Sequence, residues 1–313
     1  MHFTGRTWRP PYEAHTPIIE ATTGCTYNHC RFCSLFKNEP FRMSPIETFE
    51  QDLAEIERYQ PHARRLFWTG ASPFAMSYEN LKLRALTVRD YLVKCQSIAM
   101  LASIRDIKSK EVWQLRKLRA MGINGLSIGT ESGDDETLRL ANKGYTADDI
   151  LEQCQKLDEA GIEYYFVYMT GLAGKGNGHR NAVNSARLFS QLNPYFISVD
   201  SLTLFPDTEL YAMAQRGEFI PASEKERIAE LQTFIKSLQI RTHLLANSVS
   251  NYYPFTAYLP YDRQRAVDEL QYVLDSKNEM EMARFRDGLK SLGKEDLSSH
   301  TKAKKKGAEP ISL

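Results

Sequence analysis

Two kinds of segment alternate along most of the chain: short runs rich in β-branched and aromatic residues, and longer segments with apolar positions at helical spacing. The short runs predict strands at 17–22, 65–68, 98–104, 125–129, 162–169 and 196–204. The longer segments predict helices that begin near positions 44, 77, 109, 134, 146 and 179. Strands that alternate with helices in this way are typical of a parallel sheet with crossover helices.

The first of these helices carries a clear start signal. Apolar residues recur every three or four positions from Ile46 to Ile56, which predicts one buried face. Ser44 is expected to cap this helix, with Pro45 as its first residue and Glu47 completing a capping box.

Six strand–helix units, with no seventh or eighth, predict an α/β fold: a partial (β/α)6 TIM-like barrel with a helical C-terminal extension. We expect a core domain at 1–215 and an extension at 216–293. The extension has helical patterns at 223–237, 262–276 and 278–292, around an aromatic, irregular stretch at 251–261. The polar residues 294–313 are expected to form a disordered tail.

Composition narrows the class of protein. Of 313 residues, 42% are hydrophobic and 25% are charged, which is enough apolar content for a packed core. No apolar run approaches the ~18 residues of a membrane span, and the first residues lack the apolar segment of a secretory signal. The net charge of +1 lacks the excess of positive charge that is typical of a nucleic-acid-binding module. We therefore expect a soluble, cytoplasmic, globular protein.

Three of the five cysteines fall within nine residues, directly after the first predicted strand: Cys25, Cys30 and Cys33. An odd cysteine count without a secretion signal argues against a disulfide framework. Thiolates are soft ligands that suit iron–sulfur clusters or zinc. A cubane cluster usually takes four cysteines, so three would leave one iron open for chemistry.

Two other interpretations of these thiols stay open on the residues alone. Zinc sites of the ribbon or finger type need a second ligand pair farther along, and His29 is adjacent to Cys30 in sequence. A dithiol oxidoreductase at Cys30 and Cys33 would leave Cys25 unexplained. The alternatives are thus a non-catalytic zinc or iron–sulfur barrel protein, or a dithiol enzyme, and the spacing favours iron–sulfur over zinc.

A three-cysteine loop after the first strand of an incomplete barrel resembles the radical S-adenosylmethionine (radical SAM) superfamily. The spacing CxxxxCxxC is one residue longer than the usual CxxxCxxC, and Phe32 matches the aromatic residue before the last cysteine. The segments 126–136 and 142–146 are similar to a region shared by oxygen-independent coproporphyrinogen oxidases, tRNA methylthiotransferases and elongator-type radical SAM domains.

The resemblance implies both cofactors and the residues that hold them. A [4Fe-4S] cluster would be bound by the three loop cysteines, with S-adenosylmethionine on the remaining iron. Gly70 is in the position of a Gly-Gly-Glu-like motif that meets the methionine amino group, and Lys143 is where a basic residue meets the carboxylate. The expected SAM-binding residues are Gly70, Ser103, Arg105, Glu131, Lys143 and Phe32.

These residues share a position in the predicted fold. Cys25, Gly70, Arg105, Glu131 and Gly171 all lie at or just after the carboxyl ends of predicted strands, the face where α/β barrels build active sites. The resemblance then implies an oxidoreductase or transferase that reductively cleaves SAM to a 5′-deoxyadenosyl radical for hydrogen abstraction. It also implies a low-potential electron donor of the flavodoxin or ferredoxin type. The substrate and the residues that act on it are not readable from the sequence.

Overall fold

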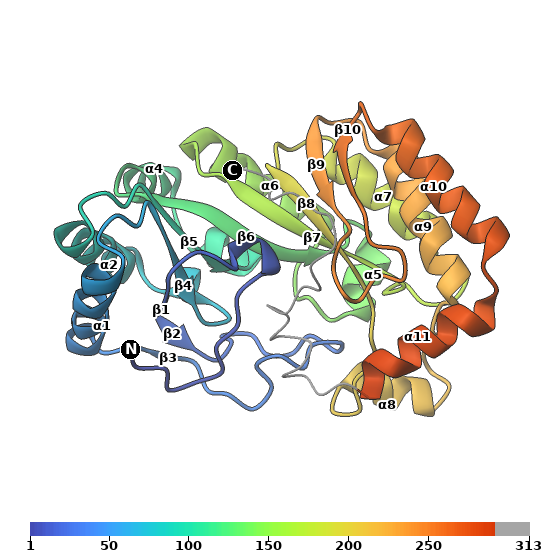
Figure 1. The fold of residues 1–313 in the computed structure, drawn as a ribbon, viewed down its shortest axis with the longest axis horizontal. Helices are drawn as coiled ribbons and strands as arrows, with labels where there is room; N and C mark the ends of the chain where they lie inside the picture. The colour runs from blue at the N-terminus through green and yellow to red at the C-terminus, as the bar shows by residue number, and fades with distance from the viewer. Residues whose placement is uncertain (292–313) are drawn as a thin grey trace.

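The computed structural model describes residues 1–291, and an eight-stranded sheet runs through its centre (Figure 1). The order is β1-β4-β5-β6-β7-β8-β9-β10, and every neighbouring pair is parallel except β9 and β10. Strands follow one another in chain order and β1 and β10 are the two edges, so the barrel is open. The strands of this sheet are Ile18–Glu20 (β1), Arg65–Thr69 (β4), Ser97–Ala102 (β5), Ile123–Glu131 (β6), Tyr164–Thr170 (β7), Phe196–Ser201 (β8), Thr242–Leu245 (β9) and Thr256–Leu259 (β10).

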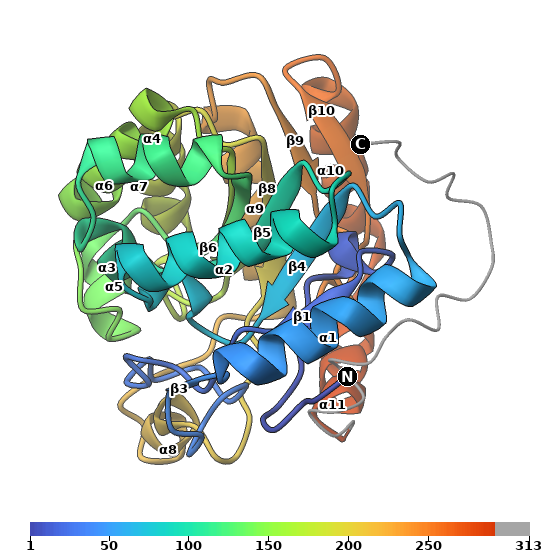
Figure 2. The same ribbon diagram turned by 90° about the vertical axis from the view of Figure 1, so that its left-hand side faces the viewer.

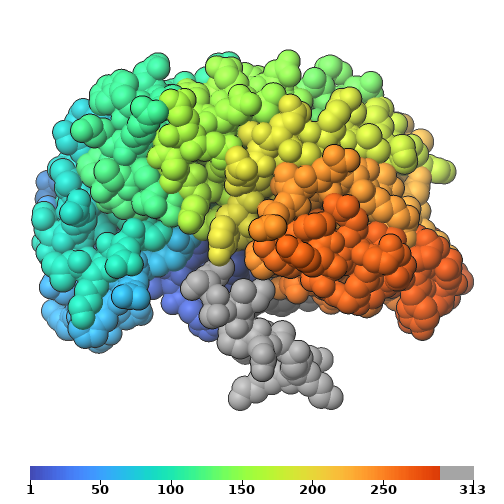
Figure 3. Space-filling view, turned by 90° about the horizontal axis from the view of Figure 1, so that it is seen from above, coloured from blue at the N-terminus to red at the C-terminus, as the bar shows by residue number. Residues whose placement is uncertain are grey.

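Helices connect the parallel strands and cover the outer face of the sheet (Figure 2). Helices α1, α2 and α4 lie at one end of the molecule, and α9, α10 and α11 form the other end (Figures 1 and 3). A small pair, β2 (Thr22–Thr23) and β3 (Arg42–Met43), flanks the cysteine loop. The helices are Ile46–Tyr59 (α1), Tyr78–Tyr91 (α2), Ile104–Lys108 (α3), Val112–Ala120 (α4), Asp135–Leu140 (α5), Ala147–Ala160 (α6), Gly178–Phe189 (α7), Glu209–Gln215 (α8), Glu224–Ser237 (α9), Arg263–Ser276 (α10) and Glu279–Ser291 (α11), with 3-10 turns Pro11–Glu13 (η1) and Pro73–Ala75 (η2).

Strand β7 shows how alternation builds the core. Tyr164, Phe166 and Tyr168 point to the helix-covered face, where the ring of Tyr168 stacks on Phe234 of α9 at 4.1 Å between centroids. Tyr165 points to the opposite, inner face. Full burial of each such aromatic side chain stabilises the fold by about 1.5–3 kcal/mol.

The N-terminal segment closes the inner face where the strands begin. The ring of Tyr12 packs edge-on against Phe196 at 4.6 Å, and its pKa is raised by burial. Next to it, Glu13 pairs with Arg65 at 2.6 Å, and Arg65 also donates to the hydroxyl of Tyr165 at 2.8 Å. The amino end of the sheet is thus filled by packed, hydrogen-bonded side chains.

The predicted fold class is confirmed, and two local predictions are corrected. Helix α1 begins at Ile46 with Pro45 at the N-cap position, so Ser44 does not cap it; the Ser44 hydroxyl is buried without a hydrogen-bond partner among the described residues. The third strand ends at Ala102, and Ser103 caps the short helix α3 that follows. A run of apolar residues through Ile104 hid this boundary, because a strand and a buried first helical turn look alike in the sequence.

The C-terminal extension contains the three expected helices, α9, α10 and α11. It also adds two strands that the sequence did not predict: β9 pairs in parallel with β8, and β10 turns back antiparallel to β9. Phe234, Leu244 and Leu259 join one hydrophobic cluster with Ile19 of β1. The boundary near 215 stays a prediction, and the expected tail at 294–313 lies outside the described residues. Within 1–291, no helix has the length and apolar character needed to cross a bilayer.

Candidate active site

The three clustered cysteines lie on the loop that leaves β2, beyond the carboxyl end of β1. Cys25, Cys30 and Cys33 are free thiols and only partly buried. The loop turns at Asn28, whose φ is +53° and whose backbone N–H points at Cys25 Sγ, 3.4 Å away. All three sulfurs are therefore available as ligands on one short loop.

Backbone hydrogen bonds fix this loop to the rest of the fold. The N–H of Arg31 donates to the carbonyl of Ala141 at 3.0 Å, and the carbonyl of Arg31 accepts from the N–H of Leu210 at 2.8 Å. The side chain of Asn142 donates to the carbonyl of His29 at 2.9 Å. Figures 1 and 2 both place α8 at the same edge of the molecule as β3. These hydrogen bonds tie the cysteine loop to the end of α5 and to α8.

Burial governs the protonation of the thiols. It raises the pKa of the Cys30 thiol, and it raises the pKa of Cys33 to about 11, while the Lys143 ammonium opposes both shifts. Cys30 and Cys33 therefore keep their protons at neutral pH and must lose them when a metal binds.

The arrangement of donors does not suit a single metal ion. Among residues 1–291, no three His, Cys, Asp or Glu side chains come close enough together to hold one ion. A tetrahedral zinc site needs its ligands around one centre. In a cubane cluster each cysteine binds a different iron, so its thiols stand farther apart. Three thiols on one loop are the ligand chemistry of a [4Fe-4S] cluster with one iron left open, and nothing in this geometry favours the zinc alternative.

Glu131 and Lys143 form a buried ion pair next to the cysteine loop. Glu131 ends β6 with a φ of +63°, and its carboxylate is 3.3 Å from the Lys143 ammonium, which also donates to the carbonyl of Gly129 at 2.7 Å. The ammonium lies 5.5 Å from the ring centre of Phe32 and 5.6 Å from that of Tyr145. Burial lowers the pKa of Lys143, but Tyr145, the Cys30 thiol and Glu131 together raise it well above its usual range. The site thus contains a permanent cation.

The other predicted residues lie along the same edge with different surroundings. Arg105 is exposed, and its guanidinium stacks on the ring of Tyr27 in the cysteine loop at 4.4 Å. The Ser103 hydroxyl is used as a helix cap, accepting from the N–H of Asp106 at 3.3 Å. Gly70 has a φ of +126°, and a Cβ there would collide with the carbonyl oxygen of Thr22, so only glycine fits.

Two further residues belong to this edge and were not predicted. Ser72 is buried, and its hydroxyl lies 3.8 Å from Cys25 Sγ and 3.3 Å from the Thr26 hydroxyl. Asp200, on the inner face near the end of β8, accepts from the Ser250 hydroxyl at 3.3 Å, and no described ion pair includes it. Two features of the sequence could have pointed to them: Ser72 comes two residues after Gly70, and Asp200 is a lone carboxylate in an apolar strand.

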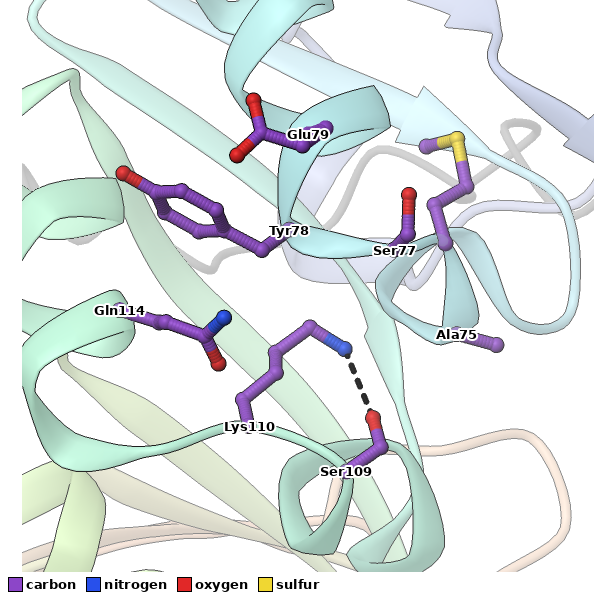
Figure 4. A pocket seen from close by; sticks show the side chains of 8 residues that line it. Ala75, Ser77, Tyr78, Glu79, Ser109, Lys110 and Gln114 are labelled. Atoms are coloured by element: carbon purple, nitrogen blue, oxygen red, sulfur yellow. Dashed lines mark hydrogen bonds between the residues drawn. The ribbon is translucent and has the colours of Figure 1, made fainter.

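A pocket of about 480 Å³ lies away from this site, between η2, the start of α2 and α4 (Figure 4). Lys110 is buried there and donates to the carbonyls of Phe74 and Asp106 and to the Ser109 hydroxyl, at 2.7, 3.1 and 3.1 Å. Burial lowers the pKa of Lys110 to about 8. All three of its donors are used, so Lys110 ties the loop that carries Ser72 to α3.

The family model of the radical SAM superfamily matches residues 19–186, which include the cysteine loop and the Glu131–Lys143 pair. The chain belongs to the radical SAM superfamily. This radical SAM protein is 24% identical to the heme chaperone HemW of Bacillus subtilis over 232 residues, 71% of this chain and 60% of HemW. It is 28% identical to the tRNA uridine(34) acetyltransferase of Methanocaldococcus infernus over 173 residues, 52% of this chain and 30% of that protein.

The fold agrees with this assignment. The structure of coproporphyrinogen III oxidase (HemN) from Escherichia coli, described as a radical SAM enzyme, matches with a TM-score of 0.53 and 18% identity. The match covers 71% of this chain and 51% of HemN. Because the chain spans less than two thirds of each of these relatives, their complete activities do not transfer to it.

Membership settles the class of protein and its cofactors. This radical SAM protein is an enzyme, and the cofactors of its family are a [4Fe-4S] cluster and S-adenosylmethionine. Radical SAM enzymes also need a reductant and a substrate. Neither the zinc-protein nor the dithiol interpretation gains support.

Proposed function

We propose that Cys25, Cys30 and Cys33 each bind one iron of the [4Fe-4S] cluster and leave the fourth iron to SAM. The observation that carries this proposal is the set of three free thiols on one fixed loop at the carboxyl edge of the sheet. When bound, the reduced cluster supplies an electron to SAM, which yields methionine and a 5′-deoxyadenosyl radical that abstracts a substrate hydrogen. The residues of the chain bind and orient SAM and the substrate, and they exclude water from the site.

Lys143 is the residue that we assign to the carboxylate of SAM. Its described hydrogen bonds, to the Gly129 carbonyl and the Glu131 carboxylate, use two of its three donors. The ammonium also interacts with the Tyr145 hydroxyl, so the SAM carboxylate would bind it through charge, and the Phe32 ring shields the ammonium from water on one side. Glu131 holds the ammonium in place and presents its second oxygen to the ribose or methionine part of SAM.

The loop after β4 is assigned to the methionine amino group. Gly70 lets this loop approach Thr22 closely, and the Ser72 hydroxyl beside Cys25 can accept a hydrogen bond from an ammonium. Arg105 packs against Tyr27 and flanks the same opening. The hydroxyl, N–H and carbonyl of Ser103 are all used in capping α3, so its proposed contact with SAM would have to share one of these groups.

The substrate is assigned only to a place, the inner face of the open sheet. Asp200 faces this side and takes part in none of the described ion pairs, which favours a substrate with a hydrogen-bond donor or a positive charge. The relatives, a heme chaperone and a tRNA acetyltransferase, differ too much to choose a substrate class. A low-potential flavodoxin or ferredoxin is the proposed source of electrons.

Release of 5′-deoxyadenosine tests the proposal. Anaerobically reconstituted protein with SAM and dithionite is expected to release it, and Cys25→Ala, Cys30→Ala and Cys33→Ala are expected to reduce release to background. Cys95→Ala and Cys154→Ala are matched controls, because these thiols lie outside the loop. Release that survives loss of a loop cysteine, or that the control variants also lose, would contradict the assignment.

A further inference from the structure

A second pocket, of about 410 Å³, lies beside the cysteine loop. We call it the arginine groove. Its polar lining comes from three segments that are distant in sequence: the cysteine loop, α5, and the loop and first turn of α7. The residues that matter here are Arg31, Glu136, Arg139, Asn177 and Arg180.

Two of the three guanidinium groups in the arginine groove lie outside the described ion pairs. Arg180 is paired, at 2.6 Å with Glu136 and at 3.2 Å with Asp134. Neither Arg31 nor Arg139 takes part in any of the described ion pairs. Arg139 is exposed, and Arg31 is partly exposed. Because Arg180 is matched by two carboxylates, the three arginines with Glu136 and Asp134 carry a surplus of one positive charge, and the guanidinium groups open to a partner are those of Arg31 and Arg139.

The arginine groove is built into the loop that holds the cluster. Arg31 directly follows Cys30, so its Cα lies about 3.8 Å from that of a proposed iron ligand. Its side chain donates to the carbonyl of Leu140 at 3.1 Å, at the end of α5, which aims the guanidinium into the groove. Electron transfer weakens steeply with distance, so a donor gains most by docking where the protein between its own centre and the cluster is thinnest.

We propose that the arginine groove is the docking surface for an acidic, low-potential electron-transfer protein, whose carboxylates meet Arg31 and Arg139. The inference rests on the proposed function, because it requires the cluster to be held by the cysteine loop. In the docked pair the donor gives up one electron and is oxidised, and the [4Fe-4S] cluster is reduced from its 2+ to its 1+ state. Opposite charge on the two surfaces speeds encounter and fixes orientation.

The key comparison is between a protein donor and a chemical one. Arg139→Glu is expected to slow 5′-deoxyadenosine release driven by reduced flavodoxin about tenfold at low ionic strength, with a smaller deficit as salt is raised. Release driven by dithionite is expected to stay within about twofold of the unchanged protein. Arg139→Lys keeps the charge and should restore most of the flavodoxin-driven rate. Arg89→Glu is the control, since Arg89 is exposed on α2 and outside the described ion pairs.

Binding provides a readout that does not depend on turnover. The Kd of oxidised flavodoxin for the reconstituted enzyme should rise about tenfold in Arg139→Glu and remain unchanged in Arg89→Glu. An unchanged Kd and an unchanged flavodoxin-driven rate in Arg139→Glu would overturn the proposal. An equal loss with flavodoxin and dithionite would also overturn it, because the groove would then serve SAM or substrate. Absence of dithionite-driven release in the unchanged protein would instead contradict the proposed function.

Discussion

The two ends of the parallel sheet differ in how their polar side chains are paired. At the amino end, Tyr12, Glu13 and Arg65 form a packed network in which charges are paired and hydroxyl groups are bonded. At the carboxyl end, the three loop thiols form no disulfide among the described residues, Lys143 is a buried cation beside them, and Asp200 takes part in none of the described ion pairs. Satisfied polar groups stabilise a fold, whereas unsatisfied ones are retained where a ligand completes them. We infer that the amino end of the sheet stabilises the barrel and that the carboxyl end binds the ligands.

Breaking the amino-end network should cost stability without affecting the cluster. Arg65→Met leaves the buried Glu13 carboxylate without its partner, which lowers the free energy of unfolding by about 3–5 kcal/mol. Urea unfolding measures the loss, and the iron content of the folded fraction should not change. Arg58→Met, at an exposed position on α1, is the control. Loss of iron by Arg65→Met protein that is still folded would show that the two ends are not independent.

Glu230 supports the carboxyl end from behind, and it makes stability depend on pH. It accepts from the N–H of Gly171 at 2.8 Å and from the side chains of Tyr168 and Asn181, and burial raises its pKa to about 7. The folded state keeps the proton up to pH 7, whereas the unfolded state releases it near pH 4.5. The free energy of unfolding therefore falls between pH 4.5 and 7, by about 3 kcal/mol relative to Glu230→Gln.

Unfolding of both proteins in urea at pH 4.5, 5.5 and 7 checks this sign. Between pH 4.5 and 7 the free energy of unfolding should fall by more in the unchanged protein than in Glu230→Gln. The two stability profiles should therefore diverge as the pH rises. Parallel profiles would mean that Glu230 ionises with an ordinary pKa in the folded protein.

A substitution of Lys143 tests whether the buried cation at the carboxyl end binds SAM. Lys143→Met should raise the KM for SAM about 30-fold, equivalent to ~2 kcal/mol of lost binding, with a smaller change in kcat. Because this variant leaves Glu131 buried and unpaired, the double variant Lys143→Met/Glu131→Gln is compared with Glu131→Gln alone if the single one unfolds. Lys108→Met is the control, an exposed lysine 2.9 Å from Asp149. An unchanged KM would remove Lys143 from the SAM site.

Ser72 should show the smallest of these effects. Ser72→Ala removes one neutral hydrogen-bond acceptor beside Cys25, which predicts about a fivefold rise in the KM for SAM, or ~1 kcal/mol. Ser276→Ala, far from the site on α10, should leave the KM unchanged. A fall in iron content in Ser72→Ala would instead show that this hydroxyl positions Cys25 rather than SAM.

The fold was largely predictable because its strands and helices carry strong periodic patterns. The strands β9 and β10 were missed because each has four residues, too short for a period of two to stand out, and β10 also lies in the irregular aromatic stretch. The closure of the amino end was not predictable either, since it depends on contacts such as Tyr12 with Phe196, which are far apart in sequence.

The candidate site divides in the same way. The cysteine loop was evident from spacing alone, and Glu131 and Lys143 from the resemblance of their segment to other radical SAM proteins. Asp200 was missed because only the register of β8 shows that it faces inward. Ser72 was missed because its role depends on the loop after β4 folding over Cys25.

The most direct test of the central claim is the electron paramagnetic resonance spectrum of the anaerobically reconstituted, reduced protein, recorded with and without SAM. The account predicts about four irons per chain and a [4Fe-4S] signal that changes when SAM is added, because one iron lacks a protein ligand. A signal indifferent to SAM, or a protein that takes up zinc in place of iron, would contradict it.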